Sequence, residues 1–227
     1  MGLGARLLGD GHGHADDASG GLIRRARLYE IFSAAAFAGR RRRVFDQLAA
    51  LSGVGPGDRV LDVGCGTGFF ATRLATAVQP GGRVDGIDPS PPMIDYAAGR
   101  ENAHCVFTVA AAEALPLEDA TFDVVTSTLV IHHITHGNRA TALAEMARVL
   151  RPGGCLLVAD FRPPTNPVAN HLISALAGHA MAHNPIGELT GLIEQAGLRV
   201  TGTGDHRPWL HYLRAGKPSS DRPRRIR

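Results

Sequence analysis

Residues 60–71, Val-Leu-Asp-Val-Gly-Cys-Gly-Thr-Gly-Phe-Phe-Ala, contain the features that decide the fold. They read as an apolar strand that ends at Asp62, a loop with alternating glycines at 64, 66 and 68, and the beginning of a helix. Glycines allow positive φ and let a ligand approach the main chain where a Cβ would collide. The first turn of the helix adds N–H groups that bind anions. The stretch therefore predicts a site for a nucleotide-like ligand with an anionic end.

Two classes of cofactor use such a loop. The run from Gly66 to Ala71 fits the dinucleotide pattern G-x-G-x-x-G/A, so the glycines alone leave an NAD enzyme open. The fuller string, in which Asp62 precedes Gly64-Cys65-Gly66-Thr67-Gly68, resembles motif I of the class I S-adenosylmethionine (SAM) dependent methyltransferases. Downstream segments decide between the two classes.

Further segments resemble this family in the right order and spacing, over residues 25–217. A short strand ends at Asp88, where a carboxylate accepts ribose hydroxyls. The other segments are Asp88-Pro-Ser-Pro-Pro-Met-Ile, Ala112-Glu-Ala-Leu-Pro-Leu of the adenine-binding loop, the fourth strand from Phe122 to Leu129, and Ala147-Arg-Val-Leu-Arg-Pro-Gly-Gly before the fifth strand. The chain is identified as resembling the small-molecule, ubiquinone/menaquinone-biosynthesis type of class I methyltransferase.

The resemblance implies SAM as the cofactor and a set of residues that bind it. These are Tyr29, Asp62, Gly64, Cys65, Gly66, Gly68, Asp88, Pro89, Met93, Ala111, Ala112, Glu113, Thr128 and Leu129. Tyr29 either covers the methionine end of SAM or packs on the sheet with Phe32. Many relatives carry an acid where this chain has Ala111, and the side chain of that acid binds the adenine amino group. Ala111 cannot make this hydrogen bond. We expect backbone N–H groups of Ala112 and Glu113 to bind the ring with one hydrogen bond fewer, worth about 1 kcal/mol.

His132 and His133 follow the fourth strand and are the candidate catalytic residues. Methyl transfer from a sulfonium is an in-line displacement, so holding both reactants in line supplies most of the catalysis. A general base is needed only where the acceptor arrives protonated, and imidazole titrates in a suitable range. The alternative is that one imidazole only hydrogen-bonds the backbone and shapes the loop.

Alternating strands and helices predict an α/β fold: a Rossmann-like, doubly wound, seven-stranded sheet with mostly parallel strands, an antiparallel last strand and an N-terminal helical cap. The expected organisation is a disordered leader (1–20), the cap (21–57), the core (58–217) with an insertion at 161–183, and a disordered basic tail (218–227). The leader segment 11–17 holds two His and two Asp. Its flexible glycines argue against a preformed metal site, so no metal is expected.

Composition sets further bounds on the class of protein. At 227 residues and 44% hydrophobic content, one well-cored domain is expected, with no run long enough to span a bilayer and a cytoplasmic location. The net charge is +3, and arginines cluster at 40–43 and in the tail. A nucleic-acid surface is one interpretation, but aromatics that would stack bases are missing, so we expect these arginines to lie in solvent. Cys65, Cys105 and Cys155 read as reduced and structural.

These observations predict a SAM-dependent methyltransferase that transfers a methyl group to a small-molecule acceptor with an O, N or C nucleophile. Nucleic acid is not expected as a partner, and a homodimer is left open. A non-catalytic SAM-binding or partner-binding module is the alternative, and an NAD-dependent oxidoreductase ranks third.

Overall fold

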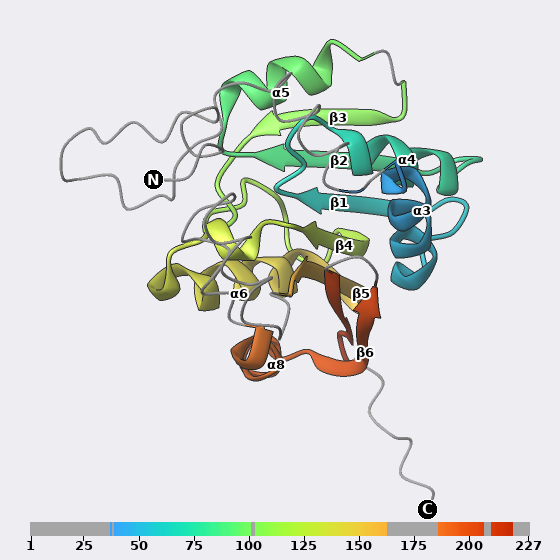
Figure 1. Ribbon diagram of the computed structural model, residues 1–227. Helices are drawn as coiled ribbons and strands as arrows, with labels where there is room; N and C mark the ends of the chain where they lie inside the picture. The colour runs from blue at the N-terminus through green and yellow to red at the C-terminus, as the bar shows by residue number, and fades with distance from the viewer. Residues whose placement is uncertain (1–36, 38, 101–102, 163–185, 207–209, 220–227) are drawn as a thin grey trace, which may run out of the picture.

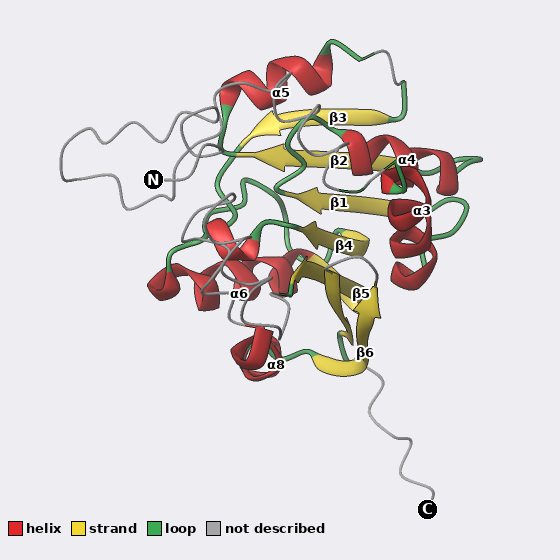
Figure 2. Cartoon of the chain, in the orientation of Figure 1, coloured by secondary structure: helices red, strands yellow, loops and turns green. Residues whose placement is uncertain are grey.

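The computed structural model describes residues 37, 39–100, 103–162, 186–206 and 210–219 (Figure 1). Its strands are β1 (Arg59–Val63), β2 (Arg83–Asp88), β3 (Cys105–Val109), β4 (Phe122–Thr128), β5 (Leu150–Phe161), β6 (Arg199–His206) and β7 (Leu210–Gly216). Its helices are α3 (Arg41–Ser52), α4 (Phe69–Ala77), α5 (Pro91–Ala98), η1 (Ile131–His133), η2 (His136–Asn138), α6 (Arg139–Val149) and α8 (Ile186–Gln195). In the described residues strands and helices alternate, as the apolar periodicity predicts, except that β4 follows β3 directly and β7 follows β6 (Figure 2).

The strands form one sheet in the order β3-β2-β1-β4-β5-β7-β6. β7 is antiparallel to β5 and β6, whereas the pairs from β3 across to β5 are parallel. The predicted fold class is therefore confirmed. β1 lies between β2 and β4, so the winding of the chain reverses there. In open sheets of this kind ligands bind outside the carboxyl ends of the strands at that reversal.

Helices cover both faces of the sheet (Figure 1). α3 and α4 lie over a core that includes Leu48 and Phe70, and α6 and α8 lie over a second core that includes Met146 and Ile193. After the exposed Arg59, β1 is buried on both faces, and three of its four buried residues are apolar, as expected for a parallel central strand. The rigid double layer fixes the carboxyl ends of the strands, where the site is expected.

Helix α3 corrects one expectation from the sequence. Val44 and Leu48 face the core as predicted, but Arg41 does not lie in solvent with the rest of its run. Arg41 is only 7% exposed, and its guanidinium carbon lies 3.7 Å from the centroid of the Phe69 ring. A flat guanidinium stacks well on an aromatic face, and Phe69 supplies that face from the first turn of α4. The charge is therefore held inside the fold.

The Pro152-Gly-Gly turn predicted before the fifth strand lies inside β5, which begins at Leu150. The pairing of β5 with β4 shifts register between Phe122 and Val124, so the extra residues are accommodated as an irregularity of the strand. Gly197, at φ +84°, follows the end of helix α8. The leader, residues 21–36 and 38 of the cap, most of the insertion and most of the tail lie outside the described residues. In the described part, no helix is long and apolar enough to cross a bilayer.

Candidate functional site

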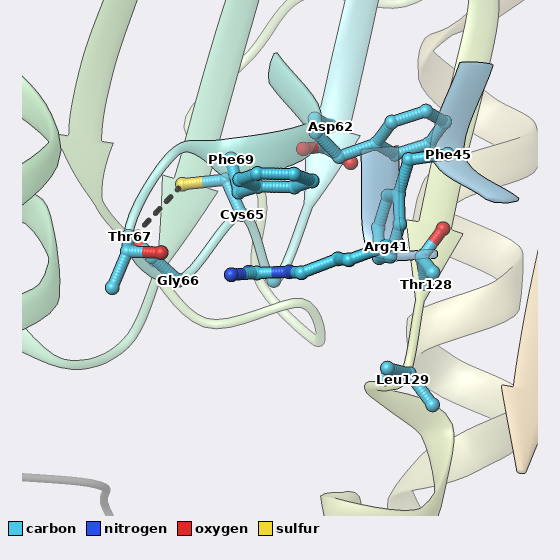
Figure 3. Close-up of a pocket in the computed structure, with 11 residues that line it drawn as sticks. Arg41, Phe45, Asp62, Cys65, Gly66, Thr67, Phe69, Thr128 and Leu129 are labelled. Atoms are coloured by element: carbon cyan, nitrogen blue, oxygen red, sulfur yellow. Dashed lines mark hydrogen bonds between the residues drawn. The ribbon is translucent and has the colours of Figure 1, made fainter. Parts of the chain in front are cut away.

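A small pocket opens at the carboxyl ends of β1 and β4, beside the glycine loop (Figure 3). Its lining residues are Arg41, Phe45, Asp62, Gly64, Cys65, Gly66, Thr67, Phe69, Phe70, Thr128 and Leu129. Six of the predicted cofactor-binding positions are among them: Asp62, Gly64, Cys65, Gly66, Thr128 and Leu129. The pocket thus forms where the sequence placed one end of the ligand.

All three glycines of the loop have positive φ, but a side chain would meet different surroundings at each of them. A Cβ on Gly64 would lie 2.2 Å from Val130 Cγ2, and one on Gly68 would lie 2.9 Å from Phe107 Cζ. A Cβ on Gly66, at φ +52°, meets no protein atom within 4 Å. Gly64 and Gly68 therefore allow close packing of the protein, whereas Gly66 leaves open space at the pocket.

Asp62 is the buried acid beneath the loop. Its Oδ1 accepts a hydrogen bond of 2.8 Å from Thr126 Oγ1, while its Oδ2 has no hydrogen-bond partner in the part of the chain that the structure describes. Burial raises the pKa of Asp62 to about 7, and the nearby charge of Asp88 adds to the increase. Leaving a buried carboxylate oxygen unsatisfied is costly, so Oδ2 is well prepared for a cationic donor from a ligand.

Asp88 ends β2 and joins two parts of the site. Its Oδ2 accepts a hydrogen bond from the Gly66 N–H and its Oδ1 accepts one from the Ser90 N–H, both at 2.9 Å. Burial raises its pKa although both backbone bonds act to lower it. Each oxygen retains a second lone pair that suits a ribose hydroxyl. Pro89 is exposed beside it, and the Met93 side chain is buried in α5.

The predicted adenine loop makes a tight turn after β3. The Ala110 N–H donates to Asp88 O at 3.2 Å, and the Ala114 N–H donates to Ala111 O at 3.3 Å. Among the described residues, no group accepts a hydrogen bond from the N–H of Ala112 or Glu113. Ala111 is exposed at the turn. These two backbone donors therefore remain unpaired within the described residues, and their binding to an adenine ring stays a prediction.

Strand β4 ends in a strained conformation at the pocket. Leu129 has φ +61°, unusual for a residue with a branched side chain, and its N–H donates to Ala159 O at 2.8 Å. Thr128 Oγ1 is buried and lacks a hydrogen-bond partner within the described ranges. Strain of this kind is typical of functional sites, so the end of β4 fits its predicted role.

His132 and His133 form η1, directly after β4. Both Asp160 oxygens hold His132: Oδ1 lies 2.6 Å from Nδ1, and Oδ2 accepts the His132 N–H at 3.1 Å. The His132 side chain is 5% exposed. His133 is exposed when the whole residue is considered. Desolvation of its ring by neighbouring atoms and the adjacent His132 lower the pKa of His133, so its imidazole is neutral at pH 7. The two candidates therefore differ: one is clamped and one is accessible.

Asp160 was not predicted as a site residue. Burial acts to raise the pKa of Asp160, but the charge and hydrogen bond of His132 outweigh burial and hold that pKa below its usual value. A carboxylate that accepts the Nδ1–H keeps Nε2 free to take a proton. The sequence signal was present, because Asp160 is an acid at the end of an apolar strand, like Asp62 and Asp88.

Five pocket residues were not predicted as site residues from the sequence: Arg41, Phe45, Thr67, Phe69 and Phe70. Arg41 extends beneath the Phe69 ring toward Gly66 (Figure 3). Tyr29 lies outside the described residues. Cys65, Cys105 and Cys155 are free, and burial raises the pKa of each thiol, which fits the predicted structural role.

Comparisons with known proteins give the same picture. Residues 60–154 match the family described as a methyltransferase domain. A ubiquinone/menaquinone biosynthesis C-methyltransferase from Ectopseudomonas mendocina is 42% identical over 125 residues, covering 52% of this chain and 47% of the relative. A malonyl-acyl-carrier-protein O-methyltransferase from Hahella chejuensis is 37% identical over 147 residues, covering 62% and 52%. The chain spans about half the length of these curated relatives.

Solved structures share the fold. A SAM-dependent methyltransferase from Aquifex aeolicus superposes with a TM-score of 0.70 at 21% identity, covering 85% of this chain and 98% of that one. A cyclase superposes with a TM-score of 0.63 at 21% identity, covering 78% and 81%. Together with the family match, these likenesses confirm the predicted resemblance and the fold.

Proposed function

We infer that this chain, whose residues 60–154 match a methyltransferase domain on a class I fold, is a SAM-dependent methyltransferase of small molecules. The observation that carries the inference is the buried Asp62 Oδ2, which has no hydrogen-bond partner among the described residues and belongs to a residue that lines a pocket beside the glycine loop. SAM supplies an activated methyl group on a sulfonium. The acceptor is a small molecule of a class that the relatives leave open, because they are named for C- and O-methylation.

The described residues fit SAM along its length. Asp62 Oδ2 would accept from the α-ammonium, and Arg41 brings a positive charge to the same pocket for the α-carboxylate. The Asp88 oxygens would accept from the ribose hydroxyls, and the free N–H groups of Ala112 and Glu113 would donate to the adenine ring. Charges of both signs at one end and donors at the other match a zwitterion joined to a nucleoside.

On the acceptor side, the His132–Asp160 pair is the proposed base. The chain would bind the acceptor against η1, exclude water and receive a proton at His132 Nε2 when the nucleophile arrives protonated. For a nucleophile without a proton, the same residues only orient the acceptor.

Calorimetry with SAM, S-adenosylhomocysteine (SAH, its demethylated form) and NAD tests this function. SAM and SAH should bind and NAD should not, and labelled methyl should reach at least one member of a panel of quinone, acyl and phenolic acceptors. Tight binding of NAD would contradict the proposal. Binding of SAM with no transfer to any acceptor would favour a non-catalytic module.

The affinity for SAH is expected to rise with pH, by roughly tenfold between about pH 5.5 and pH 7. Burial raises the pKa of Asp62 to about 7 in the free protein, and a bound ammonium would lower it. Binding below pH 7 therefore releases a proton, so a higher pH favours the complex. Calorimetry across this range measures the slope. Asp62→Asn should bind weakly with no such slope, and a pH-independent constant in the wild type would refute the role of Asp62.

Replacing Ala111 by Asp is expected to strengthen SAH binding about fivefold, because it adds an acceptor for the adenine amino group worth about 1 kcal/mol. Ala111 is exposed at the turn, so the larger side chain needs no repacking of the core. Ala111→Asn, which is similar in size and uncharged, is the matched control. A weaker affinity for the Asp variant than for the wild type would mean that the adenine lies elsewhere.

A further inference from the structure

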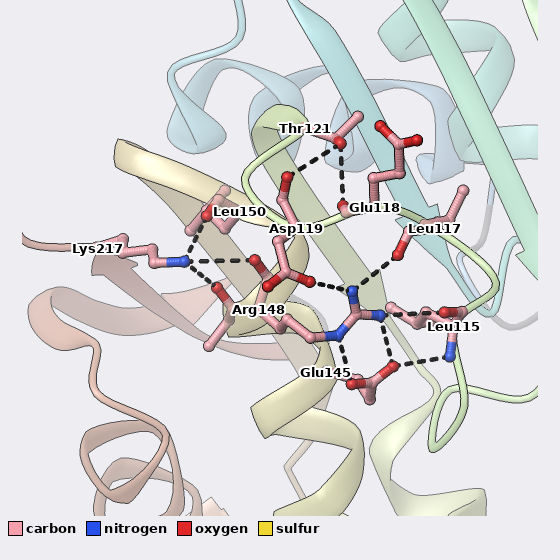
Figure 4. Close-up of polar contacts among 10 residues, drawn as sticks. Leu115, Leu117, Glu118, Asp119, Thr121, Glu145, Arg148, Leu150 and Lys217 are labelled. Carbon is pink, nitrogen blue, oxygen red and sulfur yellow. Dashed lines mark hydrogen bonds and ion pairs between the residues drawn. The ribbon is translucent and has the colours of Figure 1, made fainter.

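We propose that the ion pair of Glu145 and Arg148 on α6 is a positioning device that sets the adenine selectivity of the site. The inference rests on the proposed function, since it names what holds the adenine loop in shape. Neither residue lines the pocket at the glycine loop. They act from a helix on the sheet face opposite α3, through the segment that follows the adenine turn (Figure 4).

The Glu145–Arg148 pair hydrogen-bonds both backbone polar groups of Leu115. Leu115 N–H donates to Glu145 Oε2 at 2.9 Å, and Leu115 O accepts from Arg148 Nη2 at 3.1 Å. Glu145 and Arg148 are joined by two further bonds, Nε to Oε1 at 2.7 Å and Nη2 to Oε2 at 2.8 Å. Leu115 lies two positions after Glu113. Its backbone therefore has a fixed position and a fixed plane.

Arg148 uses every donor that it has. Besides the bonds to Glu145 and Leu115, its Nη1 donates to Leu117 O at 2.8 Å and to Asp119 Oδ1 at 2.6 Å. A guanidinium has five N–H groups in a rigid plane, and all five are engaged, which a lysine cannot reproduce. Because all five bonds have fixed directions, Arg148 fixes the geometry of the segment around Leu115 and does not act through its charge alone.

The turn is consequently held at both ends. Ala110 N–H is tied to Asp88 O before it, and Leu115 is tied to α6 after it. Between these anchors the N–H groups of Ala112 and Glu113 remain available to a ligand. Because Ala111 offers no side-chain acceptor, selection of the base falls on these two backbone donors. Their direction depends on the Glu145–Arg148 pair.

Lys217 provides a control on the same helix. Its Nζ donates to Ala147 O and to Leu150 O, both at 2.7 Å, and to the Arg148 backbone O at 3.4 Å, and so secures the end of α6 without touching the Arg148 guanidinium or the adenine loop (Figure 4). Asp119 provides a second control. Its side chain is 74% exposed and accepts a hydrogen bond from Arg148 Nη1, which does not bind Leu115.

The experiment measures Kd by calorimetry for SAH and for its inosine analogue in wild type, Arg148→Lys, Arg148→Met, Lys217→Met and Asp119→Asn, with melting temperatures recorded for each. The wild type should prefer adenine, because hypoxanthine carries a hydrogen on N1 and cannot accept there. Both Arg148 variants should lose about tenfold in SAH affinity and most of the preference, as expected when donors lose their alignment. Arg148→Lys should not rescue binding. Lys217→Met should melt earlier with unchanged preference, and Asp119→Asn should match the wild type.

Two results would overturn the proposal. One is an unchanged adenine preference in both Arg148 variants while the wild type binds SAH. The other is an equal loss of preference in Lys217→Met, which would reduce the ion pair to general stabilisation. Failure of the wild type to bind SAH at all would instead reject the proposed function together with this inference.

Discussion

Gly66→Val is expected to abolish measurable SAM binding and leave the protein folded. An added Cβ meets no protein atom within 4 Å, so the new side chain occupies only the space reserved for the ligand. We expect the Kd to rise by at least about a hundredfold, equivalent to about 2.7 kcal/mol. Gly64 and Gly68 give no such test, because side chains there would collide with Val130 and Phe107.

The matched control is Gly57→Val. Gly57 has φ +85° and also lacks atoms within 4 Å of an added Cβ, but it is not among the residues that line the pocket. Both substitutions force a branched residue into a left-handed conformation, so both should lower stability by about 1–2 kcal/mol. Only the change at Gly66 should affect calorimetric titration with SAM. Normal binding by Gly66→Val would show that the loop does not face the cofactor.

His132→Ala is expected to lower the turnover of a protonated acceptor by about a hundredfold or more, with the KM for SAM nearly unchanged. Asp160 accepts from the His132 backbone and from Nδ1, which leaves Nε2 as the only ring atom able to take the proton. Asp160→Asn should lower turnover as well, because an amide that donates to Nδ1 selects the wrong tautomer. Steady-state kinetics with the acceptor found in the panel measures both effects.

Two other histidines serve as comparisons for His132→Ala. His133→Ala should have a smaller effect, since its imidazole lacks an orienting carboxylate in the described contacts. His136→Ala should have none, because His136 is 81% exposed on η2 and faces Glu188. If neither His132→Ala nor His133→Ala loses more than a few-fold in turnover, both residues are structural and the site works by proximity alone.

Short-range patterns predicted most of the fold. The strand, glycine loop and helix of 60–71 lie within a few residues of one another, and alternating strands and helices restrict the topology to a doubly wound sheet. Asp62 and Asp88 were predictable because an acid at the end of a parallel strand lies at the same edge as every other strand end. Their separation along the chain therefore did not affect the prediction that Asp62 and Asp88 lie at the same edge of the sheet.

Long-range contacts could not be predicted in the same way. Nothing in Arg40–Arg43 distinguishes Arg41, whose burial depends on the Phe69 ring of another helix. The hydrogen bonds between Arg148 and the loop span about thirty positions, and only the spacing of Glu145 and Arg148 within one helix is visible in the sequence. Asp160 carried a signal, but its partnership with His132 depends on the register of β4 and β5.

The two bonds of Asp88 also bear on how this protein can evolve. One carboxylate shapes the glycine loop through the Gly66 N–H, starts the segment before α5 through the Ser90 N–H, and faces the ribose site. A mutation that alters it to suit a different nucleotide, such as one with a phosphorylated ribose, also loosens the loop. Descendants with a new cofactor preference would need compensating changes at several positions at once.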